Sequence, residues 1–201
     1  MHNHESLYNY ADVAKLLRDL GVPDTVVVGG FLWYPEEHAN WEQFLTPMSG
    51  KTFPNFQWSP SILWGGATMN HQGPESEASG VWHPKSVANF HEDDSNNPLS
   101  VIGTYRDAKF EIGQGEGLTE LIEQVRAGAH PEGVMLTAAI FTGQCTLSAL
   151  EIQKLADFIS AHQSDVNDGI LVWATLPDIV EIWKNEYGGN AYIYNSPSFE
   201  E

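Results

Sequence analysis

Residues 99–194 alternate between short apolar runs and amphipathic segments, and this alternation constrains the fold more than any other feature of the chain. Apolar runs predict strands at residues 99–105, 134–142, 170–175 and 191–194. Apolar residues at helical spacing predict helices at residues 117–127, 148–162 and 178–187. Strands and helices in regular alternation form a parallel sheet with helices packed outside it. We therefore expect an α/β fold.

Two of these helices have marked starts. Ser148 and Glu151 have the spacing of a capping box. Thr175 can cap the helix whose first turn holds Pro177 and Asp178. The remainder of the chain predicts a helix at residues 10–20, a buried strand at 25–28 and short strands at 61–63 and 80–82.

The length of 201 residues limits how many strand–helix units the chain can hold. An eight-fold barrel takes roughly 250 residues. We therefore predict a single α/β domain over residues 1–201, folded as an incomplete or distorted (β/α) barrel with a mostly parallel sheet. Residues 31–98 are rich in aromatic, Pro, Gly and Asn residues and are predicted to form a long loop insertion. A doubly wound sandwich is the alternative fold.

The charge of the chain excludes several classes of partner. A net charge of -18 leaves no basic face for nucleic acid or for an anionic membrane surface. No apolar run approaches the roughly 20 residues of a membrane span, and the first residues do not resemble a signal peptide. We expect a cytoplasmic protein. Cys145 is the only cysteine, which rules out an intramolecular disulfide.

Aromatic residues gather in the predicted insertion and at the predicted strand ends. Aromatic faces beside polar side chains are a usual way to hold sugar rings. Packing of the long loop against the body of the protein is the alternative role. Arg106 follows a predicted strand and is the candidate catalytic residue, suited to holding a carboxylate or an oxyanion. The candidate substrate-binding residues are Trp33, Trp64, Trp82, Tyr105 and Trp173.

Histidines supply a candidate metal site. His2 and His4 lie on one face of an extended segment, so both imidazoles could reach one metal ion. His71 follows the strand predicted at residues 61–63. We predict that His2, His4 and His71 bind a divalent metal such as zinc. A mobile chain terminus is the alternative for the first pair.

The C-terminal third resembles the closing βα units of the polysaccharide deacetylase (NodB-homology) superfamily. The resemblance is carried by residues 130–137, 150–159 with His162, 169–175 and 178–183, where the last helix contains Trp183. It implies a distorted (β/α) barrel and metal-assisted removal of acetyl groups from a glycan. The superfamily's Asp pair and its His-x-x-x-His motif are not recognisable in this sequence.

The N-terminal segment is similar to the first unit of metal-dependent amidohydrolases. His2-x-His4 is followed by the helix at residues 11–20 and the strand at 25–28. In that family a His-x-His closes the first strand and binds a catalytic metal, which implies hydrolysis of small C–N substrates.

These observations predict a deacetylase-like hydrolase acting on a carbohydrate or an acylated small molecule. A divalent metal would activate water and polarise the acyl carbonyl. A non-catalytic carbohydrate-binding or degenerate member of the superfamily is the first alternative. An amidohydrolase-type metal-dependent hydrolase is the second.

Overall fold

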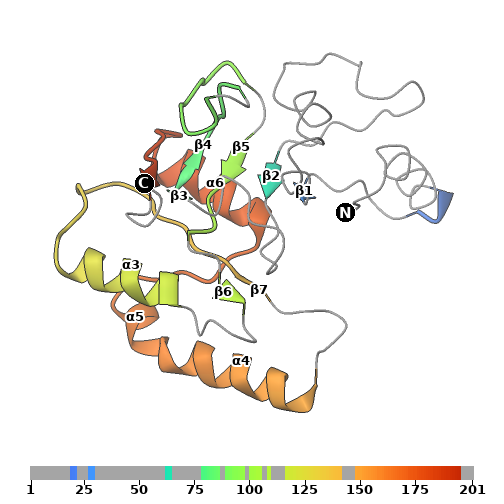
Figure 1. Ribbon diagram of the computed structural model, residues 1–201, viewed down its shortest axis with the longest axis vertical. Coiled ribbons are helices and arrows are strands. Elements are labelled where there is room, and N and C mark those ends of the chain that lie inside the picture. Colours follow the sequence, from blue (N-terminus) through green and yellow to red (C-terminus); the bar gives the residue numbers. More distant parts are fainter. Residues whose placement is uncertain are drawn as a thin grey trace.

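The computed structural model describes residues 19–21, 27–29, 62–64, 78–86, 89–97, 100–105, 108–109, 116–141 and 148–195 (Figure 1). The strands in these ranges are β1 (Val27–Gly29), β2 (Ile62–Trp64), β3 (Ala78–Ser79), β4 (Val81–Trp82), β5 (Ser100–Ile102), β6 (Ala108–Lys109), β7 (Ile140–Phe141) and β8 (Tyr194–Asn195). The helices are α3 (Glu116–Arg126), α4 (Ala149–Ala161), α5 (Gln163–Asn167) and α6 (Leu176–Glu186).

The strands form three small sheets. The largest has the order β1-β2-β5-β4, in which β1, β2 and β5 run parallel and β4 is antiparallel to β5. β3 pairs antiparallel with β8, so a strand late in the chain returns to the middle of the sequence. β6 and β7 form a separate parallel pair. The segment predicted as a loop insertion therefore contains β2, β3 and β4.

The predicted fold, an incomplete or distorted (β/α) barrel with a mostly parallel sheet, is wrong. A barrel closes only when successive strands pair on both edges around a ring. The described strands are two or three residues long and lie in three sheets that are not joined to one another. The described residues therefore do not form the barrel that the resemblance to the deacetylase superfamily implies.

Residues 134–139 form no strand, and at Thr137 a side chain bonds the backbone groups that a neighbouring strand would otherwise pair. The Thr137 backbone N–H donates to Ser79 Oγ over 2.8 Å, and Ser79 Oγ donates to the Thr137 carbonyl over 2.8 Å. The backbone groups of Thr137 are thus satisfied without a ladder. Only β7, at the end of the predicted strand 134–142, pairs with another strand.

Residues 170–175 also form no strand. The N–H groups of Ile170 and Leu171 donate to the Asp165 carbonyl, which ends α5 through Gly169 at a φ of 74°. Val172 and Trp173 are then exposed rather than packed in a sheet. An apolar run is predicted as a strand on composition, but it becomes one only beside a second strand.

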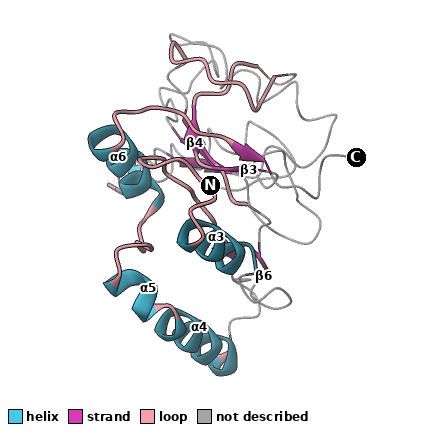
Figure 2. Cartoon of the chain, turned by 90° about the vertical axis from the view of Figure 1, so that its left-hand side faces the viewer, coloured by secondary structure: helices cyan, strands magenta, loops and turns pink. Residues whose placement is uncertain are grey.

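The helices predicted at residues 117–127, 148–162 and 178–187 are confirmed, with boundaries shifted by a few residues. The helix predicted at residues 10–20 lies almost entirely outside the described residues. α4 begins at the predicted capping box, where Ser148 Oγ accepts from Glu151 N–H and the Glu151 carboxylate accepts from Ser148 N–H. Thr175 caps α6 as predicted, in a reciprocal pair with Asp178. Figures 1 and 2 show α4 at one end of the molecule, away from the four-stranded sheet, while α6 lies beside the strands.

The core lies between α6 and the strands. Trp183 and Val180 from α6 pack with Val81 of β4 and Ile102 of β5. The Trp183 indole N–H is satisfied by the Asn190 carbonyl at 2.9 Å. This packing fixes the end of β5, and with it the segment that follows.

Candidate functional site

The described residues bring together a group of aromatic and polar side chains after the end of β5. Its members come from three places in the chain: the turn after β5, α3 with the turn that follows it, and the segment around β8. We call it the Tyr105 cluster, consisting of Tyr105, Glu120, Gln124, His130, Tyr192 and Tyr194.

Tyr105 is the most deeply buried residue of the cluster. Only 1% of its surface is exposed, and its φ is 20°, a positive value that side-chain-bearing residues rarely adopt. Its N–H donates to the Ala78 carbonyl at 3.0 Å, and the Gly103 N–H donates to the Gly80 carbonyl at 2.9 Å. These bonds hold the turn in place. Backbone strain of this kind clusters at functional sites.

The Tyr105 hydroxyl donates to Glu120 Oε1 over 2.9 Å. Burial raises the pKa of the Tyr105 phenol, and the hydrogen bonds to Glu120 and Tyr194 raise it further. The phenol therefore remains protonated and acts as a donor. Gln124, one helical turn beyond Glu120, donates from Nε2 to the same Glu120 oxygen over 3.0 Å.

His130 connects α3 to the chain segment that enters β8. Its Nε2 lies 2.9 Å from Gln124 Oε1, and its Nδ1 lies 3.2 Å from Tyr192 Oη. Its ring also meets Tyr194 edge-on, with 4.7 Å between centroids. Burial lowers the pKa of His130, which favours the neutral imidazole.

The two tyrosines around β8 form the partly exposed part of the cluster. Tyr194 stacks on Tyr105 with 5.5 Å between centroids and 28° between ring planes. Tyr192 and Tyr194 are two residues apart and both are half-buried. The pairing of β8 with β3 brings them to the turn after β5, because β3 itself is tied to that turn. Fixed polar groups beside partly exposed aromatic rings can bind a ligand that has an apolar face as well as hydroxyl groups.

Of the predicted residues whose side chains the structure describes, only Tyr105 belongs to this cluster. Trp82 is fully buried, with its indole N–H bonded to the Phe90 carbonyl at 2.7 Å and its ring edge-on to Phe90, so it packs the core in this structure. Trp173 is 42% exposed and lies against Phe158 of α4. The backbone of Trp64 lies in β2.

The remaining predicted residues lie outside the described part of the chain. They are the candidate catalytic Arg106, the candidate substrate-binding Trp33, and the candidate metal ligands His2, His4 and His71. Within the described ranges, no group of three or more His, Cys, Asp or Glu side chains could hold a metal ion. The metal prediction therefore stays a prediction.

Sequence reasoning missed most of the cluster. His130 directly precedes Pro131, a position typical of a turn, and Glu120 and Gln124 fall on an ordinary amphipathic helix. Two signals were available: the spacing of Glu120 and Gln124 by four residues, which puts them on one helix face, and the alternation of Tyr192 and Tyr194. Neither signal indicates that the two pairs meet.

No family model, curated protein or solved structure matches this chain. Its functional interpretation therefore depends on the geometry of its own side chains. Among the described residues, none of the helices is both long enough and apolar enough to cross a membrane.

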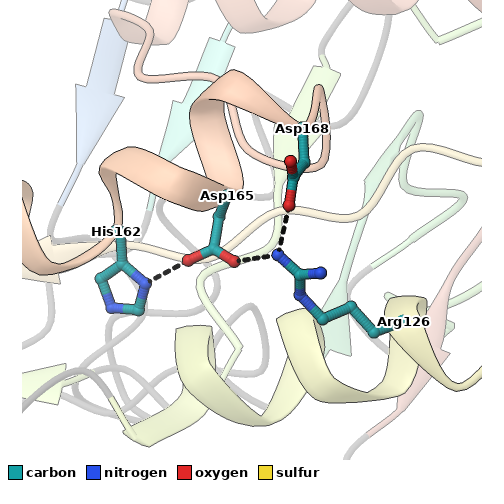
Figure 3. A network of polar contacts seen from close by, with 4 residues as sticks. All are labelled: Arg126, His162, Asp165 and Asp168. Carbon is teal, nitrogen blue, oxygen red and sulfur yellow. Dashed lines mark hydrogen bonds and ion pairs between the residues drawn. The ribbon is translucent and has the colours of Figure 1, made fainter.

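A second polar network joins α3 to α5 (Figure 3). Asp165 accepts from Arg126 Nη2 over 2.8 Å and from His162 Nδ1 over 2.9 Å, while Arg126 Nη2 also donates to Asp168 over 2.8 Å. The hydrogen bond from Arg126, followed by that from His162, lowers the pKa of Asp165. Both oxygens of this largely buried carboxylate are thus occupied by protein donors. The network holds two helices together, and both Asp165 oxygens already accept from protein groups.

Proposed function

We propose that this chain binds a carbohydrate through the Tyr105 cluster. The observation that carries the proposal is the meeting of half-buried Tyr192 and Tyr194 rings with an amide, a carboxylate and an imidazole held by mutual hydrogen bonds. Aromatic rings can stack on the C–H faces of a sugar, while the polar groups bond its hydroxyls. Because the polar groups are already held in place, binding costs little side-chain entropy.

A glycan array, followed by titration of the strongest-binding glycan, tests the proposal. Tyr192→Ala removes one partly exposed ring and its hydroxyl, and we expect it to weaken binding about ten-fold or more. Trp173→Ala is the matched control, because it removes an exposed aromatic ring that lies against α4 and outside the cluster.

The two variants distinguish binding at the Tyr105 cluster from binding at Trp173. Loss of binding in Trp173→Ala together with unchanged binding in Tyr192→Ala would move the site away from the cluster. A folded wild-type protein that binds no glycan would contradict carbohydrate binding altogether. Thermal unfolding of each variant checks that the fold is intact.

The second candidate function is metal-assisted deacetylation of a carbohydrate. It is favoured by the sequence position of Arg106, which directly follows Tyr105 and would bring the candidate catalytic residue next to the cluster. His2, His4 and His71 would hold the divalent metal, with zinc as the first metal to test. An amidohydrolase-type reaction on small C–N substrates would use the same two N-terminal histidines.

Metal content after chelation and reloading, together with hydrolysis of acetylated glycans, tests the catalytic proposal. We expect His4→Ala to lose both bound metal and activity if the chain is an enzyme of this kind. Glycan binding that is unaffected by EDTA, with no hydrolysis, would support the binding function alone. Hydrolysis of C–N substrates but not of acetylated glycans would favour the amidohydrolase reaction.

A further inference from the structure

In the Tyr105 cluster, the donor and the acceptor of each hydrogen bond can be assigned in only one way. Glu120 Oε1 accepts from the Tyr105 hydroxyl and from Gln124 Nε2, at 2.9 Å and 3.0 Å. The amide nitrogen of Gln124 therefore faces Glu120, which turns the amide oxygen toward His130. An amide oxygen is only an acceptor.

This orientation determines which nitrogen of His130 carries the proton. Nε2 lies 2.9 Å from the Gln124 oxygen and must be the donor. Neutral imidazole has one N–H, so Nδ1 is then an acceptor and the Tyr192 hydroxyl donates to it over 3.2 Å. Among the described residues, the polar and aromatic groups against this ring are Gln124 from α3, with Glu120 beyond it, and Tyr192 and Tyr194 from the segment around β8. Burial is the cause of the lowered pKa of His130, in keeping with a neutral ring.

We infer that His130 determines which ligands the Tyr105 cluster accepts, because it fixes the Tyr192 hydroxyl as a hydrogen-bond acceptor toward the ligand. The single proton of Tyr192 points to His130, so only oxygen lone pairs remain for a ligand. A ligand hydroxyl can donate to them, whereas an ether or carbonyl oxygen cannot. His130 is thus a positioning residue that acts through Tyr192, and the inference rests on the proposed carbohydrate binding.

Protonation of His130 reverses this arrangement. The imidazolium carries a proton on both nitrogens, so Nδ1 donates to Tyr192 and the tyrosine proton turns outward. The cluster then offers a donor where it had offered an acceptor. The preference for a ligand hydroxyl over a ligand ether is lost on acidification, as the ring titrates.

Two measurements test the inference, and the first needs no ligand. Long-range proton–nitrogen NMR correlations identify the protonated nitrogen of His130, which we expect to be Nε2 in the neutral ring. The second measures binding by NMR titration of methyl glucoside, methyl galactoside, methyl mannoside and methyl N-acetylglucosaminide, each compared with its mono-O-methyl derivatives. Above the pH at which His130 titrates, we expect methylation of one hydroxyl to weaken binding about ten-fold; below it, we expect the difference to disappear.

Variants separate this role from a purely structural one. His130→Asn keeps an acceptor near the position of Nδ1 and does not titrate, so its preference should persist without pH dependence. His130→Ala and Tyr192→Phe should not distinguish the hydroxyl from the ether. His91→Asn removes a histidine outside the cluster and should keep the wild-type pH dependence.

The outcomes distinguish this inference from the function on which it rests. A proton on Nδ1 of the neutral ring, or a wild-type preference that does not change with pH, would overturn the inference and leave carbohydrate binding standing. If none of the glycosides, and no glycan on the array, binds the folded protein, the proposed function fails, whatever the protonation of His130.

Discussion

Thr137 joins three separate segments of the chain through one side-chain oxygen. Its hydroxyl accepts from the Gly80 N–H at 2.9 Å and lies 3.0 Å from the Gly80 carbonyl and 2.7 Å from the Gly103 carbonyl. Thr137 and Gly80 are both buried, so water cannot replace these bonds. Thr104, next to Gly103, is also fully buried, but its hydroxyl finds no partner among the described residues.

The same substitution at the two threonines is expected to have different effects on stability. Thr137→Val keeps the side-chain shape but leaves the Gly80 N–H without its partner, which should cost about 1–3 kcal/mol of the free energy of unfolding. Thr104→Val removes a buried hydroxyl that has no described partner and should be neutral or stabilising. Urea unfolding of both variants measures the difference. Equal destabilisation by the two substitutions would contradict this account.

Helices were predicted better than strands because their signals are local. The capping pairs of α4 and α6 lie within four residues of sequence, and the apolar spacing of α3 needs no information from elsewhere in the chain. A strand depends on a neighbouring strand, which is often far away in sequence. Within residues 134–139, Thr137 bonds the Ser79 side chain instead of a strand, and residues 170–175 pair with no strand among those described, so their apolar composition misled the prediction.

The contact between α3 and α5 predicts a specific dependence on pH. The pKa of Asp165 is lower in the folded protein than its usual value of 3.8, mainly because of the Arg126 hydrogen bond. As the pH falls, the unfolded chain is therefore protonated before the folded protein. The stabilisation that the ionised Asp165 contributes is complete above pH 3.8 and is lost as the pH falls below 3.8, toward the pKa of the folded protein.

Asp165→Asn tests this dependence. We expect the free energy of unfolding of the wild type to exceed that of the variant at neutral pH, and the difference to shrink below pH 3.8. Urea unfolding over a series of pH values gives the measurement. Asp157→Asn is the matched control, because Asp157 is exposed on α4 and bonds only Gln153 among the partners described. A difference that stays constant down to acid pH would argue against the ion pair.

On the scale of the whole molecule, the charge is strongly unbalanced. Asp and Glu number 27 against 9 Lys and Arg. The excess negative charges repel one another more in the compact state than in the unfolded chain. Salt screens such repulsion, with a Debye length of about 10 Å at 0.1 M ionic strength.

We therefore expect the thermal midpoint of unfolding to rise with sodium chloride. A stabilisation of about 1 kcal/mol corresponds to a rise of about 2–4 °C for a chain of this size. Glu132→Lys replaces an exposed acid with a base and should raise the midpoint at low salt while reducing the effect of added salt. Scanning calorimetry measures both. A midpoint that falls with salt would mean that favourable ion pairs outweigh the repulsion.

The candidate site could be predicted only in part for the same reason as the strands. Tyr105 is predicted from sequence because it ends the predicted strand at residues 99–105, and sites gather at strand ends in α/β proteins. His130 and Tyr192 meet because of a strand pairing that joins distant parts of the sequence, and no local pattern encodes that meeting. The predicted metal ligands remain predictions, since the described residues do not include them.

The pairing of Ala78 with Asn195 has a consequence for the order in which the protein is made. Synthesis runs from the N-terminus, so β5, α3 and His130 leave the ribosome well before Tyr192 and Tyr194 exist. The Tyr105 cluster is therefore complete only when the segment around β8 closes a long loop back onto β3. A chain whose translation stops before residue 192 would still contain the sequence of α3, α4, α5 and α6 but would lack two tyrosines of the cluster. Under the proposed function, ligand binding would then report that synthesis had passed residue 195.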